Sequence, residues 1–393
     1  MKCTIRAERI WDGVADTYIP NREIHVSDGR IVEKPVRGDE INLDGYALMP
    51  GLINAHCHLI LHGDLDIFKV IMTDSQNRTA IKTARNAYIA LLNGITTVRD
   101  LGDKNMIVSD LARLIENGEL PGPRILYSGY PICMTGGHGW FFGREADGPD
   151  ECRKAAREQL KAGAHWIKLM ATGGILTPGV SPESFQLNED EMRAAIEEAH
   201  KAEKRTATHA QGAMGVKLAL KAGIDTVEHG FFIDDEAIEL FLKNDAWLVP
   251  TLNAPQMTIE AEGRGIPDYV IEKAKKVQEG FLDRLEKAIK AGVKIGAGSD
   301  AGTPLNGHDL FWREIVNMSG TSLGNLKALK CATSINAELL GLEKEIGRIA
   351  PGYVADLIAV KGDPIKDPSV LSNVHWVMKS GKIIKDLTSK FNL

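Results

Sequence analysis

Two histidines separated by a single residue, His56 and His58, are the first side chains in the sequence that could do chemistry. They end an apolar run, and residues two apart on a strand point to the same side. Two imidazoles on one side can bind one metal ion, because histidine nitrogens are common ligands of zinc and other divalent metals. The pair alone is a weak indication, since two structural histidines would give the same pattern.

Lys168 lies in the apolar run His-Trp-Ile-Lys-Leu-Met. A lysine is unusual there, because an unpaired ammonium is costly to bury. One interpretation is a core lysine in an ion pair. The other is a lysine whose pKa is lowered by burial, so that its amine can add carbon dioxide and form a carbamate. A carbamate is an anion with two oxygens, and it could bridge two cations.

Three further polar residues each end a short apolar run. His209 lies at the end of the run Thr-Ala-Thr-His-Ala, and His229 ends Asp-Thr-Val-Glu-His. Asp300 lies in Gly-Ala-Gly-Ser-Asp-Ala-Gly, where the glycines would let a ligand approach closely. Each residue alone could be structural. Together with the histidine pair and the lysine they give a set of candidate metal ligands, and the set is a far less likely accident than any single member.

These candidates need strands that bring them together. Between about residues 50 and 345, short apolar runs alternate with helical patterns, which predicts parallel strands joined by right-handed crossovers. Helix starts are marked by Pro149 with its acidic neighbours and by Asn188 with Glu191 three residues later, as in a capping box. The predicted strands are 47–55, 95–100, 124–132, 165–170, 206–210, 225–229, 247–252 and 293–300.

Eight such units predict an α/β fold that closes into a (β/α)8 TIM barrel, with its active site at the C-terminal ends of the strands. Every candidate ligand falls at such an end. An open doubly wound sheet is the alternative, but no Gly-x-Gly-x-x-Gly motif opens a helix after the first strand.

The two ends of the chain differ from the middle, because both show short alternating segments with Asp-Gly or Ser-Gly turns. We expect them to pair into one small β-sandwich domain. The predicted boundaries are 1–50 for the N-terminal part of this β-sandwich, 51–346 for the metal-dependent barrel and 347–393 for the C-terminal part of the β-sandwich.

Composition restricts the class of partner. The net charge of −6 argues against nucleic acid, because there is no basic excess to neutralise phosphates. The five scattered cysteines do not form a disulfide pattern and favour a reducing compartment. No apolar run suits a signal peptide or a membrane span. We expect a soluble, cytoplasmic protein with no membrane partner.

The motifs PGLINAHCH, IKLMATGG, THA, VEHG and GSDAGTP together resemble those of the amidohydrolase superfamily, and GRIAPGYVADLIAV resembles the returning strand of its β-sandwich. The stretches TGGHG and ADGPDE are most similar to the prolidase-like and carboxypeptidase-like branch related to imidazolonepropionase. The resemblance covers nearly the whole chain. It also implies a homo-oligomer.

This resemblance implies two divalent metal ions, with zinc as the natural choice and manganese or cobalt as substitutes. A hydroxide between the metals would attack an amide carbonyl, and Asp300 would act as general base and then as general acid. The implied ligands are His56, His58 and Asp300 for the more buried metal, His209 and His229 for the more exposed metal, and carboxylated Lys168 between them.

Substrate contacts follow from the same resemblance. It implies that His138 hydrogen-bonds the substrate carbonyl or carboxylate. Phe231 stands where carboxylate-binding relatives often carry a tyrosine, which puts recognition of a free α-carboxylate in doubt. Arg144 or His308 could replace the lost hydroxyl, although both could equally be surface residues. The aromatic residues at 140–142 suggest an apolar or aromatic group on the substrate.

The leading hypothesis is hydrolysis of a small-molecule amide, such as a dipeptide or an N-acyl amino acid. A mononuclear deaminase or cyclic-amide hydrolase on the same fold is the second, and Lys168 argues against it because single-metal members generally lack that lysine. A non-catalytic scaffold is the third, but it would be expected to have lost ligands. Carbamate, ester, lactone or phosphotriester hydrolysis at the same site also stays open.

Overall fold

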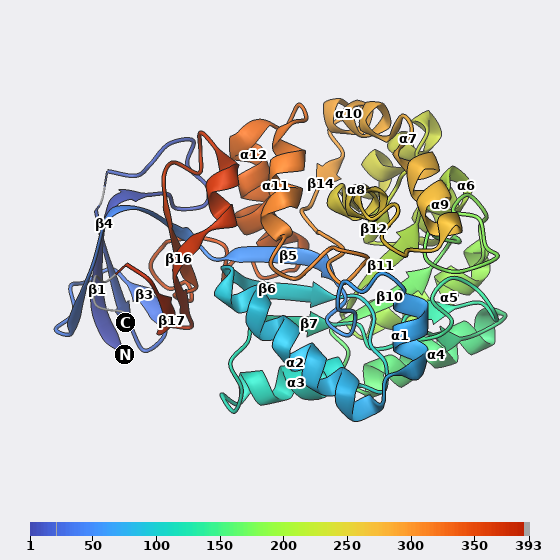
Figure 1. Cartoon of the computed structure of the whole chain (residues 1–393), viewed down its shortest axis with the longest axis horizontal. Coiled ribbons are helices and arrows are strands. Elements are labelled where there is room, and N and C mark those ends of the chain that lie inside the picture. The colour runs from blue at the N-terminus through green and yellow to red at the C-terminus, as the bar shows by residue number, and fades with distance from the viewer. Residues whose placement is uncertain (21, 389–393) are drawn as a thin grey trace.

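The computed structural model describes residues 1–20 and 22–388 and shows a mixed α/β fold with two parts (Figure 1). The larger part is a barrel of parallel strands with helices around it, which confirms the predicted barrel. Its strands are β5 (Leu52–Cys57), β6 (Ile95–Asp100), β7 (Arg124–Tyr127), β10 (Trp166–Met170), β11 (Arg205–Ala210), β12 (Thr226–His229), β13 (Trp247–Val249) and β14 (Lys294–Ile295).

The barrel closes between its last and first strands. The amide of Ala55 donates to the carbonyl of Ala297 at 3.0 Å, and the amide of Asp300 donates to the carbonyl of His56 at 2.9 Å. The regular part of β14 covers only Lys294–Ile295, so the predicted strand 293–300 continues as extended chain along β5.

Helices follow every barrel strand and form the outer layer (Figure 1). Two predicted helix starts are confirmed: Pro149 occupies the first turn of α4, and Asn188 and Glu191 form a complete capping box at α5. The helices are α1 (Ile67–Thr73), α2 (Gln76–Leu92), α3 (Ile107–Glu116), α4 (Pro149–Lys161), α5 (Glu189–Lys201), α6 (Ala213–Ala222), α7 (Asp235–Asn244), α8 (Asn253–Glu260), α9 (Asp268–Gln278), α10 (Phe281–Ala291), α11 (Phe311–Ser319), α12 (Gly324–Lys330) and α13 (Asn336–Leu339), with a π-helical turn at Cys331–Ile335 and a 3-10 helix at Pro368–Ser372.

The smaller part is a seven-stranded sheet built from both chain ends, in the order β17-β16-β15-β4-β1-β2-β3. This confirms that the termini form one β domain. Its exact boundaries at residues 50 and 346 stay a prediction. The strands are β1 (Lys2–Ile10), β2 (Glu23–Ser27), β3 (Arg30–Val32), β4 (Asp39–Pro50), β15 (Leu357–Lys361), β16 (Val374–Lys379) and β17 (Lys382–Asp386).

The predicted first strand, 47–55, is wrong as a single element. Residues 47–50 belong to β4 and pair with β15, while the barrel strand β5 begins at Leu52. The break falls at Gly51, where a Cβ atom would lie 2.3 Å from Oγ1 of Thr96. A side chain cannot fit there, so this glycine lets the chain pass from the terminal sheet into the barrel.

The predicted third strand, 124–132, also divides. It forms β7 and the short strand β8 (Ile132–Cys133), which pairs with β9 (Arg144–Glu145). Gly129 has φ +70 between the two strands, in the left-handed region that glycine adopts without strain.

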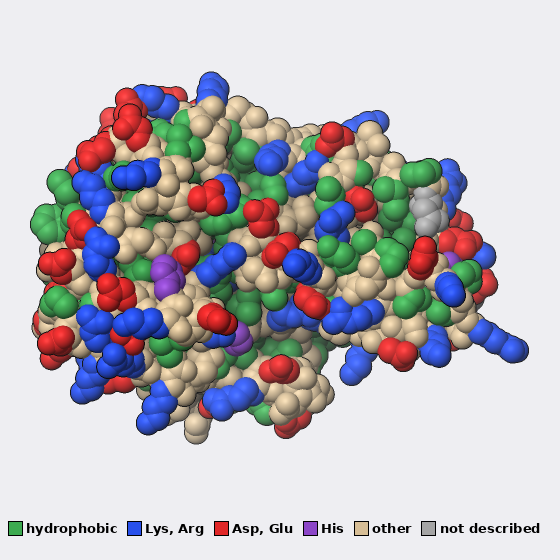
Figure 2. All heavy atoms as spheres, turned by 180° about the vertical axis from the view of Figure 1, so that it is seen from behind, with side chains coloured by type: hydrophobic (Ala, Val, Ile, Leu, Met, Phe, Trp, Pro, Cys, Tyr) green, Lys and Arg blue, Asp and Glu red, His purple; other side chains and the backbone are tan. Residues whose placement is uncertain are grey.

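The surface carries both signs of charge. On the face in Figure 2, Lys and Arg side chains are interspersed with Asp and Glu. None of the helices in the described part of the chain has the length and apolar character needed to cross a membrane. All five cysteines are buried and free.

Candidate active site

All six predicted metal ligands line one pocket at the C-terminal ends of the barrel strands. They come from β5, β10, β11, β12 and the segment that follows β14, so residues far apart in the sequence meet at one place. The pocket also contains His138 and Phe231. The ligands so placed are His56, His58, Lys168, His209, His229 and Asp300.

The side chains of His56, His58 and Asp300 converge closely. The Nε2 atoms of the two histidines lie 3.4 Å apart, and Oδ1 of Asp300 lies 3.2 Å from the first and 3.3 Å from the second. Two ligand atoms at about 2.0–2.1 Å from one tetrahedral zinc ion are ~3.4 Å apart. The three donor atoms therefore fit a single divalent metal.

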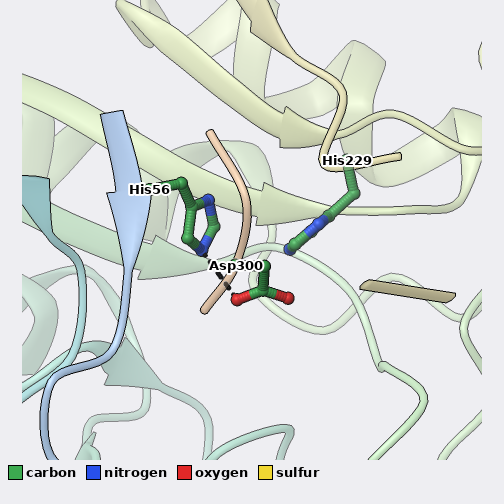
Figure 3. Close-up of side chains that lie close together, drawn as sticks. All are labelled: His56, His229 and Asp300. Atoms are coloured by element: carbon green, nitrogen blue, oxygen red, sulfur yellow. Dashed lines mark ion pairs between the residues drawn. The ribbon is translucent and has the colours of Figure 1, made fainter. Parts of the chain in front are cut away.

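His229 faces the same point from the opposite side. One ligand atom each of His56, His229 and Asp300 lie within 4.8 Å of one another. Figure 3 shows these three side chains pointing toward a common centre from three separate segments of the barrel. The donor set of imidazole nitrogens and a carboxylate oxygen suits zinc and other divalent transition metals.

Glu228 and Arg99 hold the first of these histidines in place, and the sequence analysis did not single out either residue. The Nδ1 atom of His56 lies 2.8 Å from a carboxylate oxygen of Glu228. The other oxygen of Glu228 accepts from Arg99 at 2.9 Å and from Thr226 at 2.6 Å. An Nδ1–H donated to a carboxylate leaves the Nε2 lone pair free for a metal.

In the buried pair of Glu228 and Arg99, the carboxyl group of Glu228 is ionised. Burial alone would raise the pKa of Glu228, but Arg99 and His56 hold it well below its ordinary value. Both Arg99 and Glu228 are completely buried. The only hint in the sequence was an arginine and a glutamate inside apolar strand segments, and no pattern showed that these two would meet.

A strained backbone conformation directs the side chain of His229 into the pocket. Its neighbour Glu228 already points into the barrel, so regular strand alternation would direct His229 outward. His229 instead has φ +76, in the left-handed region that non-glycine residues rarely adopt. Its Nδ1 lies 2.7 Å from the hydroxyl of Thr251, which itself has φ +49. Asp300 has φ +54, so strain is concentrated at this site.

Lys168 enters the pocket from β10 and is 1% exposed. Burial lowers its pKa to about 8, the nearby Glu228 and Asp300 raise it, and Arg99 lowers it further. A larger fraction of neutral amine is therefore present than at an exposed lysine, as addition of carbon dioxide requires.

His209 lies beside His138, with ring centroids 4.3 Å apart. The Nε2 atom of His209 lies 3.0 Å from the carbonyl oxygen of Gly173. His209 is not part of the group that His56, His229 and Asp300 form. The Nδ1 atom of His138 lies 2.8 Å from the hydroxyl of Thr177. Burial and the charge of Lys168 lower the pKa of His138 to about 3, so this imidazole is neutral.

Two predicted substrate contacts are not brought into the pocket. Arg144 forms an ion pair with Glu158 at 2.9 Å and also contacts the carbonyl of Glu145. His308 is buried, and its Nε2 lies 3.0 Å from the carbonyl of Leu61. Each side chain has a structural partner, and neither is part of the pocket wall. The structure therefore does not support them as substrate contacts.

Aromatic residues form part of the wall. Phe141 and Phe142 line the pocket as predicted, whereas Trp140 is 36% exposed and lies outside it. Phe231 packs against His229, with ring centroids 5.4 Å apart, and against Phe281 at 4.8 Å.

The fold and this site define a barrel hydrolase with polar residues for C–N bond cleavage at its mouth. The chain matches the Amidohydrolase family over residues 47–384 and belongs to that family. The family and its prolidase-like members confirm the predicted branch, and they identify the chain as an enzyme that hydrolyses C–N bonds.

Three relatives illustrate the similarity. Ochratoxinase of Aspergillus niger is 30% identical over 392 aligned residues, which cover 91% of this chain and 80% of the relative. A Xaa-Pro dipeptidase, solved with methionine bound in its active site, is 34% identical with a TM-score of 0.90 over 98% of this chain and all of the other. A prolidase complexed with N-methylphosphonate-L-proline is 30% identical with a TM-score of 0.89, over 98% of this chain and 100% of the other.

Proposed function

We propose that this enzyme is a binuclear metal-dependent hydrolase that cleaves an amide bond of a small molecule, such as a dipeptide or an N-acyl amino acid. The observation that carries this proposal is the convergence of His56 Nε2, His58 Nε2 and Asp300 Oδ1 at 3.2–3.4 Å. The presence of Lys168 in the same pocket favours two metals over one.

His56, His58 and Asp300 would hold the more buried metal, and His209 and His229 the more exposed one. Lys168 would join them as its carbamate, formed with carbon dioxide. The bound metals, zinc by our proposal, would lower the pKa of a water molecule and polarise the scissile carbonyl.

The protein's own side chains would handle protons and orientation. Asp300 would take a proton from the attacking water on a carboxylate oxygen and pass it to the leaving nitrogen. His138, neutral and held by Thr177, would hydrogen-bond the substrate oxygen. Phe141 and Phe142 would limit access of bulk water, which strengthens the electrostatic interactions inside the pocket.

The relatives support the reaction class, because the names ochratoxinase and Xaa-Pro dipeptidase both denote hydrolases. A mononuclear deaminase on this fold would not require a lysine at position 168. We keep the cytoplasmic location, the absence of a nucleic-acid or membrane partner and the homo-oligomeric state as predictions.

The test is amine release from a panel of dipeptides, N-acyl amino acids and the carboxamides of both. The enzyme is loaded with zinc in the presence of bicarbonate, and a chelated sample is the control. Turnover that is lost on chelation and restored by metal supports the proposal. Chelator-insensitive turnover would contradict it, and so would one metal per chain at full activity. A second panel of carbamates and esters tests whether the same site prefers other carbonyl groups.

A further inference from the structure

The pocket wall beyond the proposed metal ligands is mainly apolar. The side chains that form it surround the space in which the two halves of a substrate would lie. Burial of apolar surface is favourable, so a substrate gains affinity here by matching this wall. The wall residues that matter to this argument are Ile67, Phe141, Phe142, Ile175, Leu176 and Phe231.

The cationic side chains near the pocket, other than Lys168, already have hydrogen-bond or ion-pair partners in the protein. Lys273 donates to the carbonyls of Thr177 at 2.8 Å and Gly174 at 3.3 Å. Arg284 donates to the carbonyl of Phe231 at 2.7 Å, and Arg144 is paired with Glu158.

Within the described residues, the charged side chains that line the pocket are Lys168 and Asp300, and both belong to the proposed metal centre. A substrate carboxylate placed against the apolar wall would have no cation to pair with. Burial of an unpaired carboxylate is strongly unfavourable.

Gln211 supplies a neutral polar group instead. It lines the pocket and is 3% exposed. Its side-chain oxygen, Oε1, is buried and accepts no hydrogen bond from the described residues. A buried acceptor left unpaired is unfavourable, and a ligand donor would offset that cost.

The backbone of Gln211 is fixed beside the aromatic wall. Its amide donates to the hydroxyl of Thr172 at 2.9 Å, and its carbonyl accepts from the amide of Phe232 at 2.9 Å. Phe231, the preceding residue, has no hydroxyl that could bind a carboxylate. The polar head of Gln211 thus lies in the pocket that Phe231 also lines.

Resting on the proposed amide hydrolysis, we propose that the leaving half of the substrate is apolar and uncharged, with an N–H donor that Gln211 accepts, and carries no free carboxylate. This narrows the proposed substrates from free dipeptides and N-acyl amino acids to their carboxamides. Gln211 is then a specificity-determining residue for a carboxamide-bearing or otherwise N–H-bearing amide. A carboxylate would meet no counter-charge there, and only the neutral side-chain amide of Gln211 as a hydrogen-bond donor.

The test uses three matched ligands that differ only in one group. They are methylphosphonamidate analogues, in which a P–N bond replaces the scissile C–N bond, of phenylalanine, of phenylalaninamide and of phenylalanine methyl ester. Dissociation constants are measured by calorimetry with the zinc-loaded wild-type enzyme. The carboxamide should bind about tenfold tighter than the ester and about 100-fold tighter than the acid.

The variant Gln211→Leu should reduce the advantage of the carboxamide over the ester to less than about threefold, since the acceptor is gone. Its zinc content should stay at the wild-type value. Gln256→Leu is the matched control, because Gln256 lies on α8 outside the pocket wall and bonds Glu260 and Asn317. This variant should keep the wild-type ranking.

Equal or tighter binding of the acid, or no binding of any of the three ligands, would overturn the inference. An unchanged ranking in Gln211→Leu would overturn the role of Gln211. These outcomes are separate from a failure of the proposed function, which is judged by chelator-sensitive turnover. The expected ranking without such turnover contradicts the reaction and not the specificity.

Discussion

At the barrel mouth, a lysine, two acidic residues and several histidines are buried within one small volume. In the sheet formed by the chain ends, the buried cluster consists of aliphatic side chains, Cys3, Met378 and Trp376. Strand β1 alternates between buried and exposed residues over most of its length, as expected of a sheet with one covered face. The first region buries a cluster of ionisable side chains, whereas the second buries mainly apolar surface together with the Lys379–Asp356 ion pair.

The two regions also differ in backbone strain. His229, Thr251 and Asp300 have positive φ at the mouth, and each such residue costs of order 1–3 kcal/mol. The described residues of the terminal strands themselves carry positive φ only at the glycine Gly45. The comparison shows that strained backbone conformations are concentrated at the active site and not in the strands of the terminal sheet.

The largest expected effect is on activity, from Lys168→Ala. Without the amine there is no carbamate, so kcat/KM should fall at least about 1000-fold, which is ~4 kcal/mol of transition-state stabilisation. Bound zinc, measured by elemental analysis, should fall below two per chain.

Lys379→Ala is the matched control, because Lys379 is also largely buried but lies at the end of β16 in the terminal sheet and pairs with Asp356. It should lose stability and keep kcat/KM. If Lys168→Ala kept the wild-type kcat/KM and two zinc ions per chain, the bridging role of Lys168 would be refuted.

The largest expected effect on stability is in the terminal sheet. Trp376→Ala removes one of the largest fully buried side chains and should lower the free energy of unfolding by about 3–5 kcal/mol. Urea denaturation measures this loss, and zinc content of the folded fraction should not change. A loss below about 1 kcal/mol would show that the sheet contributes little to stability.

A smaller effect is expected at the support of the metal site. Glu228→Gln removes the carboxylate that orients His56, and such substitutions typically weaken metal affinity about 10–100-fold. Competition with a chromophoric chelator measures the affinity. Glu198→Gln is the control, since Glu198 pairs with Arg157 on the outer helices. Equal affinities in the two variants would refute the orienting role.

The smallest effect is expected for a charge pair outside both regions. His200 bonds Asp225 at 2.9 Å on the outside of the barrel, and that bond raises the pKa of His200. The raised pKa means that the pair contributes stability below about pH 6.5, the ordinary histidine value, and loses it as pH rises through the folded-state pKa.

His200→Gln should remove this pH dependence, with a change of at most about 1 kcal/mol because the pair is partly exposed. Unfolding free energies at pH 5.5 and 8 measure it. Identical pH profiles for wild type and variant would show that the pair contributes nothing.

Much of the barrel could be predicted from the sequence, because its strands and helices appear locally as apolar runs and helical periodicity. His56, Lys168 and Asp300 were recognised because polar residues at the ends of apolar runs are unusual. The boundary at Gly51 was missed because the residues on both sides of it are apolar, although Pro50-Gly51 is a dipeptide typical of turns. The packing against Thr96 and the pairing with β15 show that the two halves belong to different sheets.

The other features that the sequence did not show are contacts between distant residues. Arg99 and Glu228 meet across the barrel, and a single sequence does not show which charged residues become partners. For Arg144 the sequence left a substrate contact and a surface position open, and its direction in the structure depends on Glu158 in α4. Loop side chains have no periodicity, so their orientation follows from tertiary contacts.

The pairing of β4 with β15 also has a consequence for synthesis on the ribosome. Pro50 lies opposite Leu357, so one edge of β4 has no partner until about 300 further residues have been made. At ~5–20 residues per second this interval lasts on the order of 15–60 s. During that time the edge of β4 is a template for pairing with other chains. The open edge of β4 is therefore a greater aggregation hazard during synthesis than in the final fold, where β15 covers it.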